Sequence, residues 1–211
     1  MNTHTSTNEA NTTSNDCKWW MANFKIDWSE SEGRPRSYLD IAITLEVLCP
    51  LLAWQEPSLW RIHRRWDAET RDHQFWFEFW SDEPDAKAIF ARLDAEFFPL
   101  SKRSEWRVKL ETPPPKPTFE GIGEEIWNDS IRHSWPYYIH GVSQLWMKML
   151  RSEADHIIYD AQSNPFNKYK AIEESMNRIW HIEAQHAFLH HINVVFGNTP
   201  VKVWQQYNFV F

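Results

Sequence analysis

The chain has 211 residues, 42 % of them apolar and 24 % charged, which predicts a globular protein with a sizeable core. Its net charge of −7 provides no basic excess, so the composition argues against a nucleic-acid partner. We find no N-terminal leader and no apolar run of membrane-spanning length, and Cys17 and Cys49 have no metal-ligand spacing. We therefore expect a soluble cytoplasmic protein with reduced cysteines and no membrane partner.

The first part of the chain alternates between strand-like and helix-like segments. Residues 1–17 are rich in Asn, Thr and Ser and are expected to form a disordered tail. Apolar residues alternate from Lys18 to Trp28 and again from Leu59 to Trp66, and each segment predicts a strand. Between them, Tyr38–Ala53 is apolar with isolated acids, which predicts a helix that ends near Pro50.

The segment from His73 to Phe98 contains a strand, a cap and a helix without interruption. Phenylalanine occupies every second position from Phe75 to Phe79, which is typical of a strand with one buried face. Ser81–Pro84 can cap and start a helix, and apolar residues at steps of three and four over Ala86–Phe97 predict its buried side. A further strand is predicted over Trp106–Glu111.

The predicted order is strand, helix, strand, strand, helix, strand, which is that of the ferredoxin-like split βαβ pattern. We therefore predict an α+β fold in which residues 18–112 form a ferredoxin-like βαββαβ domain. Its four-stranded antiparallel sheet is expected to carry two helices on one face. The other face should stay open unless another part of the chain or another protein covers it.

The second part of the chain is predicted to be helical. Residues 113–120 are rich in proline and are expected to form a stiff linker to a helical region over residues 121–211. The elements expected there are a short helix, a hairpin of two long helices and a closing strand, over Gly123–Arg132, Tyr137–Ala161, Lys168–Phe196 and Val201–Phe211. The hairpin and the strand could cover the open face and extend the edge of the sheet.

A doubled Glu-x-x-His motif is the one metal-like pattern in the chain. Pairs of this motif hold di-iron centres in helical bundles, but such a centre also needs glutamates from two other helices. A short hairpin would moreover place residue 153 level with residue 175. The side chains are therefore either metal ligands or polar groups at the edge of a helix pair, and they are Glu153, His156, Glu183, His186 and His190.

The sequence contains no nucleophile constellation and no Gly-rich phosphate loop. Its only basic cluster lies in the predicted hairpin, next to several tryptophans. This surface could hold an acidic extended peptide, which could also pair with an exposed sheet edge; a solvated strand face is the other interpretation. The candidate peptide-binding residues are Trp60, Arg61, His63, Arg65, Trp66, Trp76 and Trp80.

Four predicted parts follow one another along the chain. They are a small sheet domain, a proline linker, a histidine-bearing hairpin that ends in AFLHHINVVFGNTPVKV (187–203), and a closing strand. This organisation resembles the accessory subunits of enzymes that mature ribosomal peptides (RiPPs), of the MbnC and TglI type in methanobactin and thiaglutamate biosynthesis. The resemblance spans most of residues 18–211 and includes no catalytic motif. It implies a non-catalytic subunit without a cofactor of its own, in a heterodimer with a TIM-barrel enzyme that holds multinuclear non-haem iron.

The resemblance also implies a division of roles. The sheet domain would bind the leader of a precursor peptide, the helical part would face the enzyme, and the enzyme would oxidise a cysteine in the core of that peptide. This peptide-binding subunit is our first hypothesis. A small metalloenzyme that uses the Glu-x-x-His pairs is the second, and a structural or regulatory ferredoxin-like dimer is the third.

Overall fold

The structure is a computed structural model, and it describes residues 17–29, 33, 35–67, 69–103, 106–117, 127–158, 164 and 166–196. Several predicted segments therefore lie outside the described residues in whole or in part. They are the tail before Cys17, the end of the linker, the start of the short helix, the last residues of the helix predicted over Tyr137–Ala161, and the closing strand over 201–211.

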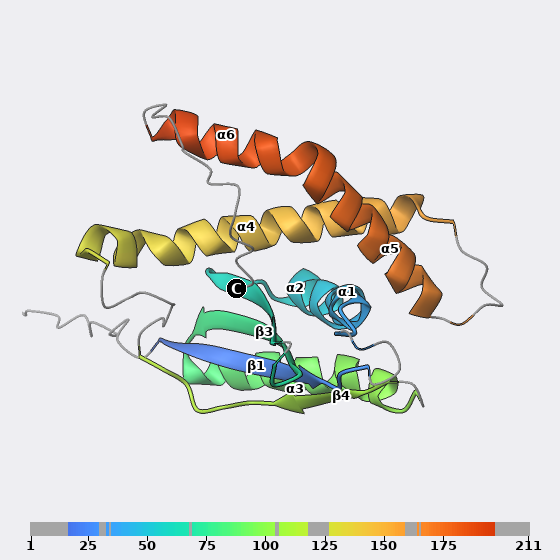
Figure 1. Cartoon of the computed structure of the whole chain (residues 1–211). Coiled ribbons are helices and arrows are strands. Elements are labelled where there is room, and N and C mark those ends of the chain that lie inside the picture. The colour runs from blue at the N-terminus through green and yellow to red at the C-terminus, as the bar shows by residue number, and fades with distance from the viewer. Residues whose placement is uncertain are drawn as a thin grey trace, which may run out of the picture.

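The described residues form an α+β fold around a four-stranded antiparallel sheet, as predicted (Figure 1). The strands lie in the order β2-β3-β1-β4, with β1 and β3 in the centre and β2 and β4 at the two edges. The alternating sequence patterns locate all four to within two residues at each end. The strands are β1 (Lys18–Ile26), β2 (Trp60–Asp67), β3 (Asp72–Ser81) and β4 (Val108–Glu111).

The first helix is longer than the sequence predicts. α1 (Tyr38–Ile43), a π-helical turn (Thr44–Leu48) and α2 (Cys49–Trp54) follow one another without a break, so the prediction that the helix ends near Pro50 is wrong. Proline lacks the N–H that a helix interior requires. The π-helical turn Thr44–Leu48 lies just before Pro50, and its changed hydrogen-bond pattern accommodates a residue without an N–H.

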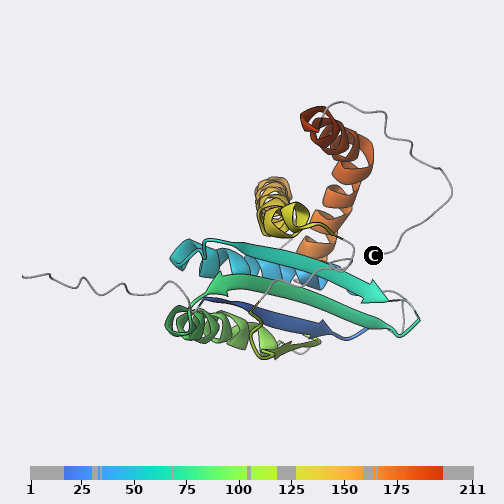
Figure 2. The same cartoon turned by 90° about the vertical axis from the view of Figure 1, so that its left-hand side faces the viewer.

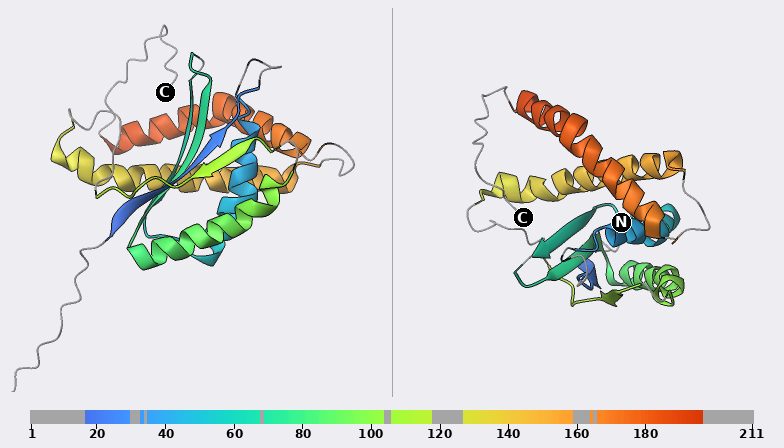
Figure 3. Two further views of the ribbon diagram at one scale, coloured as in Figure 1. Left: turned by 90° about the horizontal axis from the view of Figure 1, so that it is seen from below. Right: turned by 45° about the vertical axis from the view of Figure 1, so that its right-hand side comes forward.

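The helix α3 (Glu83–Ser101) begins where the sequence predicts. The side chain of Asp82 accepts a hydrogen bond from the N–H of Asp85 at 2.9 Å, and a proline lies in the first turn. Figure 3 shows α3 and the α1–α2 helix on the same side of the sheet. The core between these helices and the sheet is aromatic: Phe24 contacts both Phe75 and Phe97, with ring centroids 6.0 and 5.7 Å apart.

The helix α4 (Asp129–His156) joins two predicted helices into one. We expected a short helix to end at Arg132 and a second to start after Pro136, but Pro136 lies inside α4. Asn128 caps the helix instead, because its side chain accepts a hydrogen bond from the N–H of Ile131 at 2.9 Å. Pro136 is the eighth residue of α4, and the helix continues through it although a proline inside a helix removes one backbone hydrogen bond, so the expected boundary was wrong.

The second arm of the hairpin is nearly as predicted. α5 (Phe166–Ile179), a π-helical turn (Trp180–Ala184) and α6 (Gln185–Val195) are continuous. α5 shares the core of the sheet domain, whereas α6 has no buried residue and extends away from the sheet (Figures 1 and 2). Among the described helices, none is long and apolar enough to cross a membrane.

The hairpin covers an edge of the sheet, not its open face. α4 lies along β2 (Figure 2). Nδ1 of His140 lies 3.2 Å from the nitrogen and 3.0 Å from the oxygen of Trp60, and Oγ of Ser143 accepts a hydrogen bond from the N–H of Ile62 at 3.0 Å. An uncovered edge strand offers its unpaired backbone N–H and C=O groups to another chain. In this structure the β2 edge is therefore closed to strand addition at these two residues.

Replacing Ser143 with alanine is expected to lower the free energy of unfolding by about 1–2 kcal/mol, because the N–H of Ile62 loses its acceptor at a half-buried edge. Urea denaturation measures the change, and hydrogen exchange should show faster exchange of the Ile62 amide. The control is Ser152→Ala, an exposed serine on the same helix. Equal stability of the two variants would show that this side chain does not protect the edge.

Candidate functional site

The two faces of the sheet differ because side chains alternate along each strand. One face packs against α1, α2 and α3. Cross-strand pairs such as Arg61–Glu78 and Asn23–Trp76 point to the opposite side, and Trp135 and Tyr137 of α4 reach one end of it. We call this the polar–aromatic face; it comprises Trp19, Met21, Asn23 and Lys25 of β1, Arg61, His63 and Arg65 of β2, Gln74, Trp76, Glu78 and Trp80 of β3, and Lys109 and Glu111 of β4.

An aromatic pocket of about 600 Å³ lies at the end of this face where β1 begins. Trp19 and Trp80 line it with ring centroids 5.5 Å apart, and Trp127 and Trp135 line it from the start of α4 with centroids 4.8 Å apart. The Nε1 atom of Trp135 is buried and has no hydrogen-bond partner. An apolar or aromatic side chain with an acceptor atom would match these surroundings.

The middle of the face holds an ion pair and a contact between an imidazole and an indole. Nε and Nη2 of Arg61 donate to the two carboxylate oxygens of Glu78 at 3.0 and 2.9 Å. The ring of His63 meets that of Trp76 edge to face, with centroids 5.0 Å apart. Burial, followed by the charges of Arg61 and Arg65, lowers the pKa of His63 to about 4, so this ring is neutral at pH 7.

Two buried polar atoms on this face have no hydrogen-bond partner, namely Oδ1 of Asn23 and Nδ1 of His63. Asn23 is only 8 % exposed, and its amide nitrogen donates a long bond of 3.4 Å to Gln74. Buried polar groups are nearly always paired, with protein, water or a ligand. Each of these two atoms thus lacks the partner that a buried polar group normally has.

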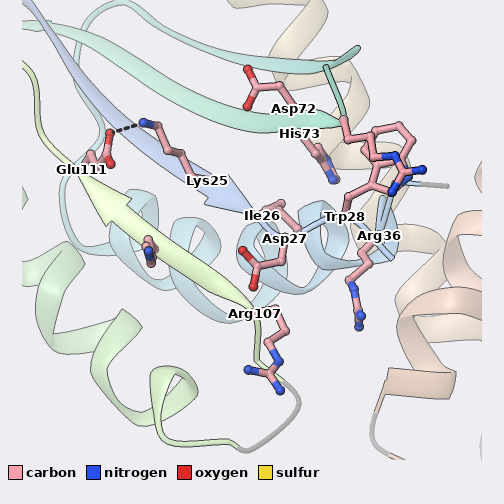
Figure 4. Close-up of a pocket in the computed structure, with 11 residues that line it drawn as sticks. Lys25, Ile26, Asp27, Trp28, Arg36, Asp72, His73, Arg107 and Glu111 are labelled. Carbon is pink, nitrogen blue, oxygen red and sulfur yellow. Dashed lines mark ion pairs between the residues drawn. The ribbon is translucent and has the colours of Figure 1, made fainter. Parts of the chain in front are cut away.

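A second pocket, of about 810 Å³, lies at the other end of the face, where β1 ends and β4 begins (Figure 4). We call it the cationic pocket. Its walls come from β1, the segment before α1, the β2–β3 turn and β4. Five cationic side chains outnumber three acidic ones: Lys25, Arg36, Arg71, Arg107 and Lys109 against Asp27, Asp72 and Glu111.

Most of these cations are not neutralised. Lys25 pairs with Glu111 at 2.9 Å, as Figure 4 shows. By contrast, no ion pair or side-chain hydrogen bond joins Arg36, Arg71 or Arg107 to another described residue, and Nε of Arg36 is buried without a partner. The pocket thus presents three unpaired guanidinium groups in a chain whose net charge is −7.

A buried charge cluster lies behind the cationic pocket. His73, which is 1 % exposed, lines the pocket, and its Nδ1 has no hydrogen-bond partner. Its Nε2 lies 2.9 Å from one carboxylate oxygen of the fully buried Asp40. The other oxygen of Asp40 accepts a hydrogen bond from Arg64 at 2.8 Å, and Arg64 also lies 3.6 Å from Glu173 of α5. This cluster connects α1, β2, β3 and α5.

The structure divides the predicted peptide-binding residues between two faces. Arg61, His63, Arg65, Trp76 and Trp80 lie together on the polar–aromatic face, whereas Trp60 and Trp66 lie on the other. Trp60 is 2 % exposed and belongs to the core, so the expectation that it anchors a ligand at the surface is wrong. Arg61 is not free either, because Glu78 already occupies its guanidinium.

The predicted metal ligands are separated. Glu153 accepts a hydrogen bond from Ser175, which agrees with the expected level of residue 153 in the hairpin. His156 bonds the backbone of its own helix, and Glu183 lies 3.7 Å from Arg178. His186 and His190 stack on each other with centroids 5.8 Å apart. Among the described residues, no group of three or more His, Cys, Asp or Glu side chains could hold a metal ion.

The hairpin has an apolar groove of its own, of about 380 Å³, between β2, α4 and the α5–α6 helix. Trp66, Trp146, Met149, Trp180 and Phe188 are among the residues that line it. Neighbouring apolar side chains on the helices are exposed, including Val142 at 46 % and Leu189 at 54 %. A surface of this kind is typical of a protein–protein contact.

No sequence motif marks Asp40, His73 or the arginines of the cationic pocket. Their positions could have indicated the pocket, because Arg36, Arg71 and Arg107 directly precede or lie close before α1, β3 and β4. These three elements start at the same end of the antiparallel sheet. Comparisons of the chain with protein-family models, with curated proteins and with solved structures found no match.

Proposed function

We propose that the chain is a non-catalytic, peptide-binding subunit and that an extended peptide lies on the polar–aromatic face. The observation that carries this proposal is the arrangement of that face: an aromatic pocket at one end, a cationic pocket at the other, and unpaired buried polar atoms between them. Extended peptides are recognised by pockets for alternate side chains and by unpaired polar groups.

The length of the face suits a short peptide segment. Trp19 at one end and Asp27 at the other are eight positions apart along β1, which corresponds to about 25 Å in a strand. A segment of about eight extended residues would span both pockets. The outer edge of β4 adds backbone groups, because Asp27 and Arg107 form a hydrogen-bonded pair and the groups of Val108 and Leu110 consequently point away from β1.

The wider proposal follows the resemblance to accessory subunits of ribosomal-peptide maturation enzymes. The peptide is then the leader of a precursor, and the partner is a TIM-barrel enzyme that holds the iron and performs the oxidation in the cytoplasm. The apolar groove and the exposed side chains of α6 support a contact with such a partner.

We further propose that the sheet domain is ferredoxin-like, because β3 lies between the parallel strands β1 and β2.

The test changes the half-buried Trp76 and the exposed Arg65 on this face. Arg61 is left unchanged, because Arg61→Glu would place a second acid beside Glu78 in a buried pair. Random 12-residue peptides displayed on phage are selected against the wild-type chain, and their affinities are measured by fluorescence polarisation. The double variant Trp76→Ala, Arg65→Glu is expected to bind the selected peptides about 10–100-fold more weakly, because it loses an aromatic contact and reverses a charge.

The matched control is Trp54→Ala, which removes an exposed tryptophan from α2, on the other side of the sheet. It should leave the affinity unchanged, and circular dichroism should show that both variants are folded. Two results would remove the face from consideration: a selection that enriches no peptide over an unrelated protein, or selected peptides that bind wild type and the double variant equally.

A further inference from the structure

We infer that the cationic pocket is a carboxylate-binding site, which takes an acidic side chain of the bound peptide. This inference deepens the proposed function and rests on it for the identity of the ligand as a peptide. Its physical basis is independent: the unpaired guanidinium groups of Arg36, Arg71 and Arg107 come from three different connections and line one pocket.

The chemistry of the pocket favours a carboxylate. Guanidinium groups bind carboxylates through paired, charge-assisted hydrogen bonds, which are stronger than bonds between neutral groups. Arg36 and His73 both line the pocket, and Nε of Arg36 and Nδ1 of His73 are buried polar atoms without a partner. The unpaired carboxylate of Asp27 lies in the same pocket and opposes a second anion, but the three arginines outnumber it.

The backbone conformation of Arg71 supports the same inference. This residue has a φ of 54°, the left-handed region in which glycine or asparagine is normally found. Arginine at such a position is strained, and nothing in the turn requires its side chain: Asp67 organises the turn through the N–H groups of Glu69 and Thr70. A strained backbone at Arg71 therefore agrees with a role of its side chain in the pocket.

The test measures binding of a rhodamine-labelled hexaglutamate peptide by fluorescence polarisation at low salt. Arg36→Gln with Arg107→Gln, and separately Arg71→Gly, are each expected to weaken binding at least tenfold. Arg71→Gly should also keep or raise the midpoint of thermal unfolding, since it relieves strain, and so weaker binding by this variant cannot result from unfolding. Arg178→Gln, at an exposed arginine on α5, removes one positive charge as Arg71→Gly does; it is the control for that variant and should leave the affinity unchanged.

Each outcome decides the inference. No hexaglutamate binding by wild type would overturn the inference. An equal loss in Arg178→Gln and the pocket variants would overturn it in favour of general charge attraction. Hexaglutamate binding that depends on the pocket arginines, with no peptide obtained by phage selection, would keep the carboxylate site and reject the proposed function. Selected peptides that depend on Trp76 but not on these arginines would keep the proposed function and reject the carboxylate site.

Discussion

Replacing Asp40 with alanine is expected to lower the free energy of unfolding by about 3–5 kcal/mol, the cost of removing one partner from a buried ion pair. Asp40 is fully buried and bonds both His73 at 2.9 Å and Arg64 at 2.8 Å. Its loss leaves the buried His73 without its carboxylate partner and the half-buried Arg64 guanidinium without its shortest contact. Because the cluster also reaches Glu173, the packing of α5 on the sheet domain should weaken at the same time. Urea denaturation followed by circular dichroism measures the change.

Two further variants separate charge from packing. Asp40→Asn keeps the volume and one acceptor oxygen, so its loss should be smaller than that of Asp40→Ala. Glu83→Ala breaks the exposed ion pair with Lys87 and should have little effect, because water screens such pairs. If Asp40→Ala were no more destabilising than Glu83→Ala, the buried cluster would not contribute to the stability of the fold.

Lowering the pH from 7.5 to 5 is expected to cost about 2 kcal/mol of stability through His63 alone. The pKa of this residue falls from 6.5 to about 4 on folding, because burial and the charges of Arg61 and Arg65 disfavour its protonated form. Between these two values the unfolded chain binds more protons than the folded chain. The contribution is therefore absent above pH 6.5 and grows as the pH falls toward 4.

His63→Gln isolates this contribution, because glutamine does not titrate. Urea denaturation of wild type and variant across the pH range gives the difference in unfolding free energy between them. That difference should shift in favour of the variant by about 2 kcal/mol from pH 7.5 to pH 5. A constant difference would mean that His63 keeps its ordinary pKa in the folded chain and that the polar–aromatic face is wetter than its packing indicates.

Local patterns predicted the strands and most helices because the signals are periodic and short in range. The alternation of Phe75, Phe77 and Phe79 depends only on the pleat of β3, and the cap at Asp82 depends only on the next three residues. The errors also have a local cause. Pro50 and Pro136 were read as helix boundaries, but a π-turn accommodates the first and α4 continues through the second.

The candidate site could be predicted only in part for the same reason. Alternation alone separates His63 and Arg65 from Trp60 and Trp66, yet it does not show that Trp60 is a core residue or that Glu78 neutralises Arg61. Such pairings depend on the register between strands. Registers are set by the hydrophobic pattern of the whole sheet and by its turns, not by any one segment.

The sequence by itself thus determined an α+β chain with a four-stranded sheet, of which one face is aromatic and buried, and an α-helical hairpin that follows it in the chain. Only the tertiary structure decided where the hairpin lies, which is along β2, where His140 and Ser143 meet the backbone of the edge strand. It also brought Arg36, Arg71 and Arg107 into one pocket and placed Asp40 against His73 and Arg64. The physical reason is that these contacts join residues from separate elements, so they exist only after the strands have paired and the helices have packed.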